Sequence, residues 1–469
     1  MSFVPPRAFR ERAARVASVT VLMLACAEAL ALEPPSPGPQ QSAVAAIPGL
    51  LDSATRKEVA EKFAAQLDEE YALPELGKKM AQVIRAKLAA GDYNKIASGT
   101  EFAHRLETDA RLVSSDKHLR VNFVGGGTAM PAGPPPANMM ELMRADNGSV
   151  RKVQILSGNV GYMEVNGVPP LGMAKDAIAA AFAFLHNTDA LIIDVRGNGG
   201  GDPNTVALYM SYLSEGPPYV VDTVHFRRGG VVESKTTDVG ELSYGAKKPV
   251  FCLTTHRTFS GGEELAYDIQ AFKRGRVVGE ATGGGAHPVF PRPLGHGFMV
   301  GMPTGYGVHP VTGSNWEGVG VKPDIEVPAG QALIEAHRLA VDRLKDSASD
   351  PTVRAALETL LAAFQREAGH AGASVIPNTL TPEQVAGAYA SSSGPGPVIL
   401  QKDSSLFLQF PRAAPPMRLV PLGADRYAME GFPDDFMATF TQKVGKVQLL
   451  AELGNWPPVV VQRQGARDE

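Results

Sequence analysis

Residues 190–201 read ALIIDVRGNGGG, and residues 250–264 read VFCLTTHRTFSGGEE. Each stretch opens with four consecutive apolar residues and then enters a turn rich in glycine or small polar residues. A short apolar run that ends at turn residues is typical of a buried strand. Helical patterns follow each turn, over 205–213 and 262–272. Two strand–turn–helix units in succession predict parallel strands with helical crossovers.

The same alternation extends upstream of these two units. Residues 159–165 have the pattern of a strand, and residues 173–186 have the pattern of a helix. We therefore predict an α/β core over residues 151–335.

The segments on either side of the core differ from it in their hydrophobic patterns and composition. Apolar spacing over 50–124 predicts an N-terminal helical subdomain, in which Ser98 and Glu101 form a capping box. Glycine and proline mark residues 125–150 as a linker. A helical connector is expected over 336–377, and short apolar runs between turn residues predict a small all-β domain, barrel or sandwich, over 378–469.

The amino terminus has the pattern of a secretion signal. Four arginines precede an uncharged stretch over 16–27, which is shorter than the roughly 20 residues that span a bilayer. We expect residues 1–31 to be a cleaved signal peptide and 32–49 a linker, so that the mature chain has no transmembrane span. The alternative is lipoprotein processing, with a lipid anchor at Cys26. Both interpretations predict a periplasmic or secreted protein.

Charge and cysteine content exclude several classes of function. The 45 basic and 49 acidic residues give a formal net charge of -4 without long runs of one sign, so we expect no nucleic-acid partner. Cleavage of the signal would leave Cys252 as the single thiol, in an apolar strand-like run. An internal disulfide and a cysteine-based metal site are then excluded. We expect no cofactor and no metal.

Ser260 is the first candidate for chemistry. It lies between a buried strand and an amphipathic helix, where helix amides and the helix dipole would face a developing negative charge. A hydrolase nucleophile would suit this position. Ser260 and Glu263 also fit a capping box, which requires no chemistry, and one serine can serve in both roles.

The glycine-rich turn over 197–201 is the second candidate. Glycines let backbone amides approach a ligand closely, as one half of an oxyanion hole requires. A phosphate loop is disfavoured, because no Lys-Ser or Lys-Thr follows and no Gly-x-Gly-x-x-Gly is present. The turn could also be only a tight connection between strand and helix.

Taken together, the two stretches resemble the carboxy-terminal-processing serine protease superfamily. Two further segments match its pattern: VVGEATGGG at 277–285, and NWEGVGVKPD at 315–324, which resembles the tricorn-like and retinoid-binding-protein-like branch. The resemblance covers roughly residues 100–330. It implies a crotonase-like (ClpP-like) core and serine peptidase activity.

The resemblance also implies site residues, with one departure. Members with a Ser-Lys dyad carry the lysine after the Val-Gly-Glu segment, where this chain has no lysine. The tricorn-like branch uses a histidine and a glutamate, which match His118 and Glu317. The branch has a serine just before that histidine, where this chain has Lys117. His287, beside the missing lysine position, is the other candidate base.

The expected site therefore combines Ser260 as nucleophile, His118 as base and Glu317 as the residue that orients it. The oxyanion is assigned to Gly199, Gly200 and Gly261. The expected substrates are peptides or unfolded protein tails, although the chain has no room for the peptide-binding PDZ module of dyad-type relatives. The alternative function is a non-catalytic binding protein for hydrophobic small molecules or peptides on the same fold.

Overall fold

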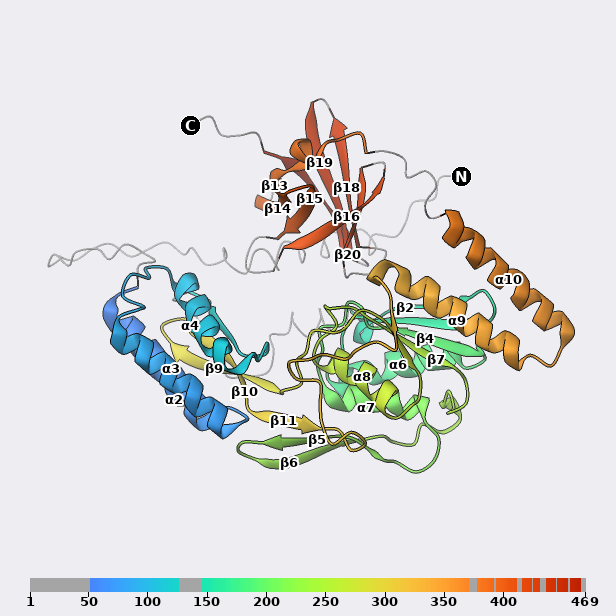
Figure 1. The fold of residues 1–469 in the computed structure, drawn as a ribbon, viewed down its shortest axis with the longest axis horizontal. Helices are drawn as coiled ribbons and strands as arrows, with labels where there is room; N and C mark the ends of the chain where they lie inside the picture. Colours follow the sequence, from blue (N-terminus) through green and yellow to red (C-terminus); the bar gives the residue numbers. More distant parts are fainter. Residues whose placement is uncertain are drawn as a thin grey trace, which may run out of the picture. The chain divides into compact units, whose positions relative to one another are not determined.

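The computed structural model describes residues 51–125, 146–370 and most of 378–464, with gaps in the last range at 392–393, 411–415, 424, 431–435, 444 and 454–455. The predicted signal peptide, the linker 32–49, Cys26 and most of the linker 125–150 lie outside the described residues. Of the described residues, those up to Gln365 form one compact unit and those from Arg366 onward form a second (Figure 1).

A six-stranded sheet forms the centre of the first unit. Its order is β12-β8-β7-β4-β3-β2, and all neighbours pair in parallel except β2 and β3. The strands are β2 (Val150–Leu156), β3 (Val160–Val165), β4 (Ala190–Asp194), β7 (Val250–Thr254), β8 (Arg276–Gly279) and β12 (Ile325–Glu326). The predicted strands over 190–195 and 250–254 are β4 and β7, and they are neighbours in the sheet.

Helices cover both faces of this sheet. One face holds α6 (Leu171–Leu185), α7 (Pro203–Leu213) and α8 (Gly261–Ala271), and the other holds α9 (Ala332–Ser347) and α10 (Pro351–His370). Leu191 and Ile193 of β4 point into the first layer, and Ile192 points into the second. Because both faces are buried, the strands are continuously apolar. α9, which lies largely in the predicted connector, packs directly on the sheet.

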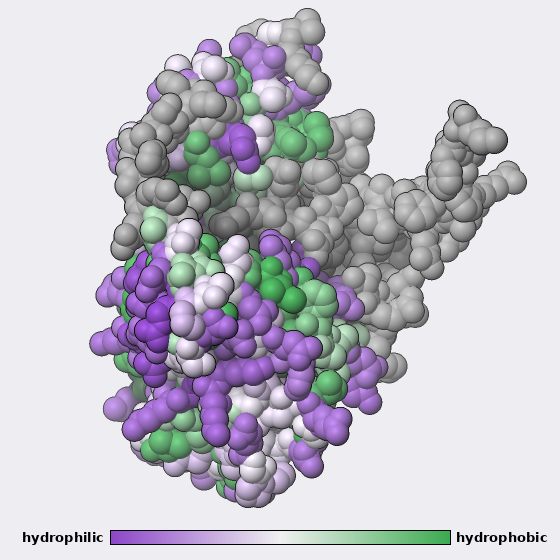
Figure 2. All heavy atoms as spheres, turned by 90° about the vertical axis from the view of Figure 1, so that its right-hand side faces the viewer, coloured by the Kyte–Doolittle hydropathy of each residue, from purple (hydrophilic) through white to green (hydrophobic). Residues whose placement is uncertain are grey.

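One face of the described residues is mixed in character. The face shown in Figure 2 is mostly hydrophilic, with hydrophobic side chains in separate patches. None of the helices in the described ranges has the length and hydropathy needed to span a bilayer.

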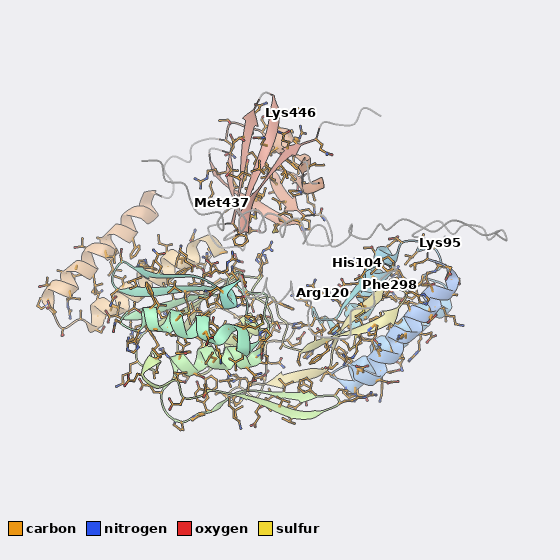
Figure 3. The ribbon with its side chains drawn as sticks, turned by 180° about the vertical axis from the view of Figure 1, so that it is seen from behind. Lys95, His104, Arg120, Phe298, Met437 and Lys446 are labelled. Atoms are coloured by element: carbon orange, nitrogen blue, oxygen red, sulfur yellow. The ribbon has the colours of Figure 1, made fainter. Side chains whose placement is uncertain are left out.

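The N-terminal layer of the first unit has its own core and combines two parts of the chain that are far apart in sequence. Its helices are α2 (Ser53–Glu70), α3 (Pro74–Ala90) and α4 (Gly99–Ser114). They pack on a sheet in which β1 (Arg120–Phe123) pairs with β10 (Phe298–Pro303), and β10 pairs with β9 (Val289–Gly295). Figure 3 labels Arg120, Phe298 and His104 of β1, β10 and α4 in this layer. The predicted helical subdomain is therefore completed by strands from residues 289–303.

A third sheet and the second unit complete the described structure. The third sheet has the order β11-β5-β6, with β5 (Val220–Phe226), β6 (Gly230–Lys235) and β11 (Gly305–Val308). In the second unit, α11 (Pro382–Val385) precedes a closed antiparallel barrel. Its strands are β13 (Gly387–Ser391), β14 (Gly394–Lys402), β15 (Ser405–Gln409), β16 (Met417–Gly423), β17 (Arg426–Met429), β18 (Phe436–Lys443), β19 (Lys446–Leu453) and β20 (Trp456–Arg463).

These elements confirm the predicted fold class: an α/β core, N-terminal helices and a C-terminal all-β part. The choice that the sequence left open between barrel and sandwich is decided in favour of a barrel.

A buried ion pair holds the end of β4, immediately before the glycine-rich turn. Arg196 contacts the carboxylate of Asp194 at 2.7 Å, and the two side chains are 1% and 0% exposed. Tyr162 also donates to this carboxylate at 2.8 Å. The other end of the guanidinium donates to the carbonyl of Ala329 at 2.8 Å, just before α9. Arg196 therefore joins the central sheet to the layer on its second face.

Arg196→Ala should lower the free energy of unfolding by about 3–5 kcal/mol, because it leaves the Asp194 carboxylate buried without its cation. Arg85→Ala is the control. Arg85 pairs with Asp68 at 2.7 Å, but these side chains are 39% and 31% exposed, so the expected loss is below about 1 kcal/mol. Urea denaturation of both variants measures the difference. Equal losses of unfolding free energy in the two variants would show that the buried pair contributes no more to stability than the exposed one.

Candidate active site

Ser260 adopts a backbone conformation that serine rarely takes. It directly precedes α8, and its φ of 51° and ψ of -125° lie near the first central position of a type II′ turn, where glycine is preferred. Holding a residue with a side chain there costs on the order of 1–3 kcal/mol, and such strain concentrates at functional sites. The side chain is partly exposed, between the carboxyl end of β7 and the amino end of α8.

Glu263 holds this strained turn. Its fully buried carboxylate accepts a hydrogen bond from the Ser260 N–H at 2.8 Å, as in a capping box. It also accepts from the Thr282 hydroxyl at 2.5 Å and from the N–H groups of Gly284 and Gly285 at 2.6 and 2.8 Å. Burial raises the pKa of Glu263, and the hydrogen bonds oppose this shift. One carboxylate thus joins the Ser260 turn to the glycine-rich loop after β8.

The glycine-rich turn after β4 lies against Ser260. Gly200 has a φ of +104°, and a Cβ atom at this position would lie 2.5 Å from the Ser260 Cβ, so only glycine fits. The Gly200 N–H donates to the side chain of Asn198 at 2.8 Å. A Cβ atom at Gly261 would lie 2.7 Å from Val168, whereas one at Gly199 would meet nothing within 4 Å. The structure therefore brings Gly200 to the Ser260 turn, next to Gly261, and the Gly200 amide already donates to Asn198.

His118 approaches the same turn from the N-terminal layer. It lies between α4 and β1, two residues before Arg120, which Figure 3 labels in this layer. Its ring centroid is 4.5 Å from that of Phe259, the neighbour of Ser260. A Cβ atom at Gly285 would be 2.7 Å from its Cε1 atom. His118 is 8% exposed, and burial lowers its pKa to about 4, with the charge of Asp116 opposing the shift. The imidazole is therefore neutral at pH 7.

Glu317 and His118 lie close together and both have an unpaired polar atom. The Glu317 Oε2 atom accepts from the N–H of Ala286 at 2.6 Å and from that of His287 at 3.3 Å. The Glu317 Oε1 and His118 Nδ1 atoms are buried without a hydrogen-bond partner. Side-chain ligand atoms of Asp116, His118 and Glu317 lie within 4.8 Å of one another. Burial raises the pKa of Glu317, and the charge of Asp116 adds to this effect.

Asp116 was not identified from the sequence, yet it makes more contacts here than either predicted partner of Ser260. Its carboxylate accepts from the Tyr71 hydroxyl, the His287 Nδ1 atom and the His118 N–H, each at 2.8 Å. Its pKa is lowered: burial alone would raise it, but the hydrogen bonds, led by the one from His287, outweigh burial. The sequence around Asp116 does not distinguish a buried aspartate that contacts histidines from an exposed one. No signal in the sequence therefore marks its role.

His287, the other candidate base, has its imidazole held by carboxylates. It is 4% exposed and lies 2.8 Å from Asp116 Oδ2 and 3.7 Å from Glu317 Oε2. Burial would lower its pKa, but the hydrogen bond to Asp116 and the charges of Glu317 and Asp116 raise it above the ordinary value. His287 is thus placed to carry a proton between two carboxylates, whereas His118 is placed to remain neutral.

Lys117 stands where the tricorn-like branch has a serine, and its side chain contacts the glycine-rich loop after β8. Its Nζ atom donates to the carbonyl of Gly283 at 2.5 Å, across to the glycine-rich loop. His256 pairs with Glu280 at 2.9 Å on the surface and is outside this cluster.

The acidic neighbour of Glu263 on α8 behaves differently. Glu264 is buried, its Oε1 atom has no hydrogen-bond partner, and burial together with the charge of Asp268 raises its pKa well above the ordinary value. Burial therefore favours the neutral form of Glu264, whereas the Glu263 carboxylate accepts four hydrogen bonds.

Comparisons with known proteins identify the family of the chain. Residues 159–327 match the model of peptidase family S41, and residues 50–152 match the model of the N-terminal domain of this family in eukaryotic IRBP. The tricorn protease of Thermoplasma volcanium is 26% identical over 215 residues, which are 45% of this chain and 18% of that protein.

Two solved structures are similar to the chain at low sequence identity. The structure of a lipoprotein from Streptococcus agalactiae has 16% identity and a TM-score of 0.41, covering 67% of this chain and 99% of that one. The photosystem II D1 C-terminal processing protease has 15% identity and a TM-score of 0.37, covering 58% of this chain and 93% of that one.

Glu263→Gln should lower the free energy of unfolding by about 2 kcal/mol, because its NH2 group would face N–H donors and leave at least one buried donor unpaired. Glu264→Gln is the matched control on the same helix, because the Glu264 Oε1 atom has no hydrogen-bond partner to lose, and it should cost less than about 1 kcal/mol. Thermal and urea denaturation compare the two. Equal losses of stability, or a larger loss in Glu264→Gln, would contradict the proposal that the hydrogen bonds of Glu263 hold the Ser260 turn.

Proposed function

Because the chain belongs to peptidase family S41, we propose that it is a serine peptidase with Ser260 as nucleophile. The observation that carries this proposal is the strained backbone of Ser260, held by Glu263 at the amino end of α8. A capping serine needs no strain, because ordinary N-cap residues have extended backbone angles. Strain that the surrounding structure maintains is characteristic of functional positions.

In this proposal His118 is the general base. Its neutral imidazole takes the proton of the Ser260 hydroxyl at Nε2 while the Ser260 oxygen attacks the peptide carbonyl carbon. His118 then returns the proton to the leaving amine, and the acyl-enzyme ester remains. Water then attacks the acyl carbon while His118 takes its proton. The bond between this carbon and the Ser260 oxygen breaks, His118 returns the proton to the Ser260 oxygen, and the carboxylic acid product leaves.

Glu317 orients His118. An Nδ1–H directed at the unpaired Oε1 atom of Glu317 selects the tautomer that leaves the Nε2 lone pair free for Ser260. The two atoms are not hydrogen bonded in the free protein. Hydrogen bonds of this kind are often long before substrate binds and shorten in the complex.

The oxyanion of the tetrahedral intermediate would be bound at the amino end of α8. We assign this role to the N–H groups of Gly261 and Gly199, with the helix dipole adding to the stabilisation. Gly200 is not assigned to the oxyanion, because its N–H already donates to Asn198. Its lack of a side chain lets the turn after β4 approach the Ser260 turn closely.

Peptides or unfolded protein tails are the proposed substrates, since the family is one of peptidases. We also propose export, on the basis of the arginines and the uncharged stretch within residues 1–31, with Cys26 as an alternative anchor.

Ser260→Ala and Ser260→Gly should both abolish labelling by a fluorophosphonate probe and lower peptide hydrolysis by up to about a million-fold. The glycine variant should be more stable than the alanine variant by about 1 kcal/mol, because glycine adopts a positive φ without strain. Probe labelling, hydrolysis of a peptide library followed by mass spectrometry, and urea denaturation measure these effects. Undiminished hydrolysis in either folded variant would refute the assignment.

The pH dependence of kcat/KM distinguishes the two histidines. A base must be deprotonated, so with His118 the rate should rise through about pH 4 and be level by neutral pH. With His287, whose pKa is raised, the rate should rise above the ordinary histidine range. His118→Ala should lower kcat/KM by about a thousand-fold or more, and His287→Ala by much less. The reverse ranking, with circular dichroism showing both variants folded, would assign the base to His287.

A further inference from the structure

Asp116, His118 and Glu317 form a cluster with the donor atoms of a metal site. One ligand atom from each residue lies within 4.8 Å of the other two. His118 is more than nine-tenths buried, and its Nδ1 atom has no hydrogen-bond partner. The Oε1 atom of Glu317 is also buried and unpaired. Unpaired buried polar atoms are costly, and a bound cation would satisfy both.

The two carboxylates are oriented by groups outside the cluster. Asp116 Oδ2 accepts from the Tyr71 hydroxyl and lies 2.8 Å from His287 Nδ1. Glu317 Oε2 accepts from the amides of Ala286 and His287, which leaves Oε1 facing inward. Hydrogen bonds to the outer atoms of ligating residues are the usual support of a metal site.

We propose that Asp116, His118 and Glu317 bind one divalent ion of the Zn²⁺ class, and that the bound ion blocks hydrolysis. The inhibitory half of this inference rests on the function proposed above, whereas the binding half does not. One imidazole nitrogen and two carboxylate oxygens are ligands that suit zinc, whereas Ca²⁺ and Mg²⁺ prefer oxygen ligands alone.

The spacing requires a small contraction. Ligands bonded to a tetrahedral zinc ion at about 2.1 Å lie roughly 3.4 Å apart, whereas the present cluster extends up to 4.8 Å. Three protein ligands would leave the fourth position for water.

The mode of inhibition follows from the tautomers of imidazole. A neutral imidazole carries one proton, on Nδ1 or on Nε2. An ion on His118 Nδ1 takes that lone pair and leaves the proton on Nε2, so His118 cannot accept the proton of Ser260. The ion also occupies Glu317 Oε1, which would otherwise orient the imidazole.

This inference departs from the expectation of no metal, which relied on the lack of cysteine ligands. Histidine and carboxylate ligands from residues 116–118 and 317 are separated by about two hundred positions, and their meeting depends on the fold.

Binding is tested without any need for hydrolysis, by titrating Zn²⁺ into the purified full chain carrying Ser260→Ala, with isothermal calorimetry as the readout. We expect one ion per chain. Adding His118→Gln should weaken binding by about 100-fold. Adding His256→Gln, which removes the imidazole of an exposed histidine–carboxylate pair outside the cluster, should leave the affinity unchanged.

Glu317→Gln provides a second variant that keeps His118, and near-ultraviolet circular dichroism checks the fold of each protein. Co²⁺ in place of Zn²⁺ gives a visible absorption band that should disappear with His118→Gln. Unchanged Zn²⁺ affinity in folded His118→Gln and Glu317→Gln would overturn the inference. So would a loss confined to His256→Gln.

The inhibitory half is tested on the wild-type chain with a peptide substrate. Zn²⁺ should abolish hydrolysis at saturation, and EDTA should restore it fully. Hydrolysis without zinc binding would refute this inference and leave the proposed function intact. Zinc binding by a chain that hydrolyses no peptide would refute the proposed function and leave the metal site intact. Zinc binding with full activity would overturn the inhibitory half.

Discussion

The Glu263 carboxylate is the interaction on which the candidate site depends. It accepts four hydrogen bonds inside the core, three of them from backbone amides, and it joins the Ser260 turn to the loop after β8. Without these bonds the turn would lose what holds Ser260 at a positive φ. The loop would also lose the contact that places Gly285 against the ring of His118. One buried acid therefore sets both the conformation of Ser260 and the position of Gly285 against the ring of His118.

The pKa values of His118 and His287 are shifted in opposite directions, although the two histidines lie in the same region. Both are buried, and burial alone would lower the pKa of each. His287 lies between two carboxylates and gains affinity for a proton, whereas the ring nitrogen Nδ1 of His118 has no partner. Asp116 causes much of this difference, because its side chain contacts the ring of His287 but only the backbone N–H of His118.

Local pattern predicted the elements that are continuous in the chain. The apolar runs before Arg196 and before Ser260 are buried strands, and each turn is followed by a helix. The family resemblance led to His118 and Glu317, and the structure brings their ligand atoms within 4.8 Å of one another. The pairing of β1 with β10 could not be predicted, because it joins residues 120–123 to residues 298–301 through contacts with no local signature. The role of Asp116 was missed for the same reason, since its partner His287 lies 171 positions away.

The shared sheet of the N-terminal layer has a consequence for the order of assembly. A chain emerges from the ribosome amino end first, and its parts fold as their partners become available. The helices α2 to α4 and strand β1 must wait for β9 and β10, whose apolar residues complete their core. His118 lies directly before β1 and therefore acquires its position only after residue 303 has been made, later than the whole of the Ser260 turn. The nucleophile's turn and the base thus come together only after β10 has been made, so that a chain that ends before residue 303 lacks the complete constellation.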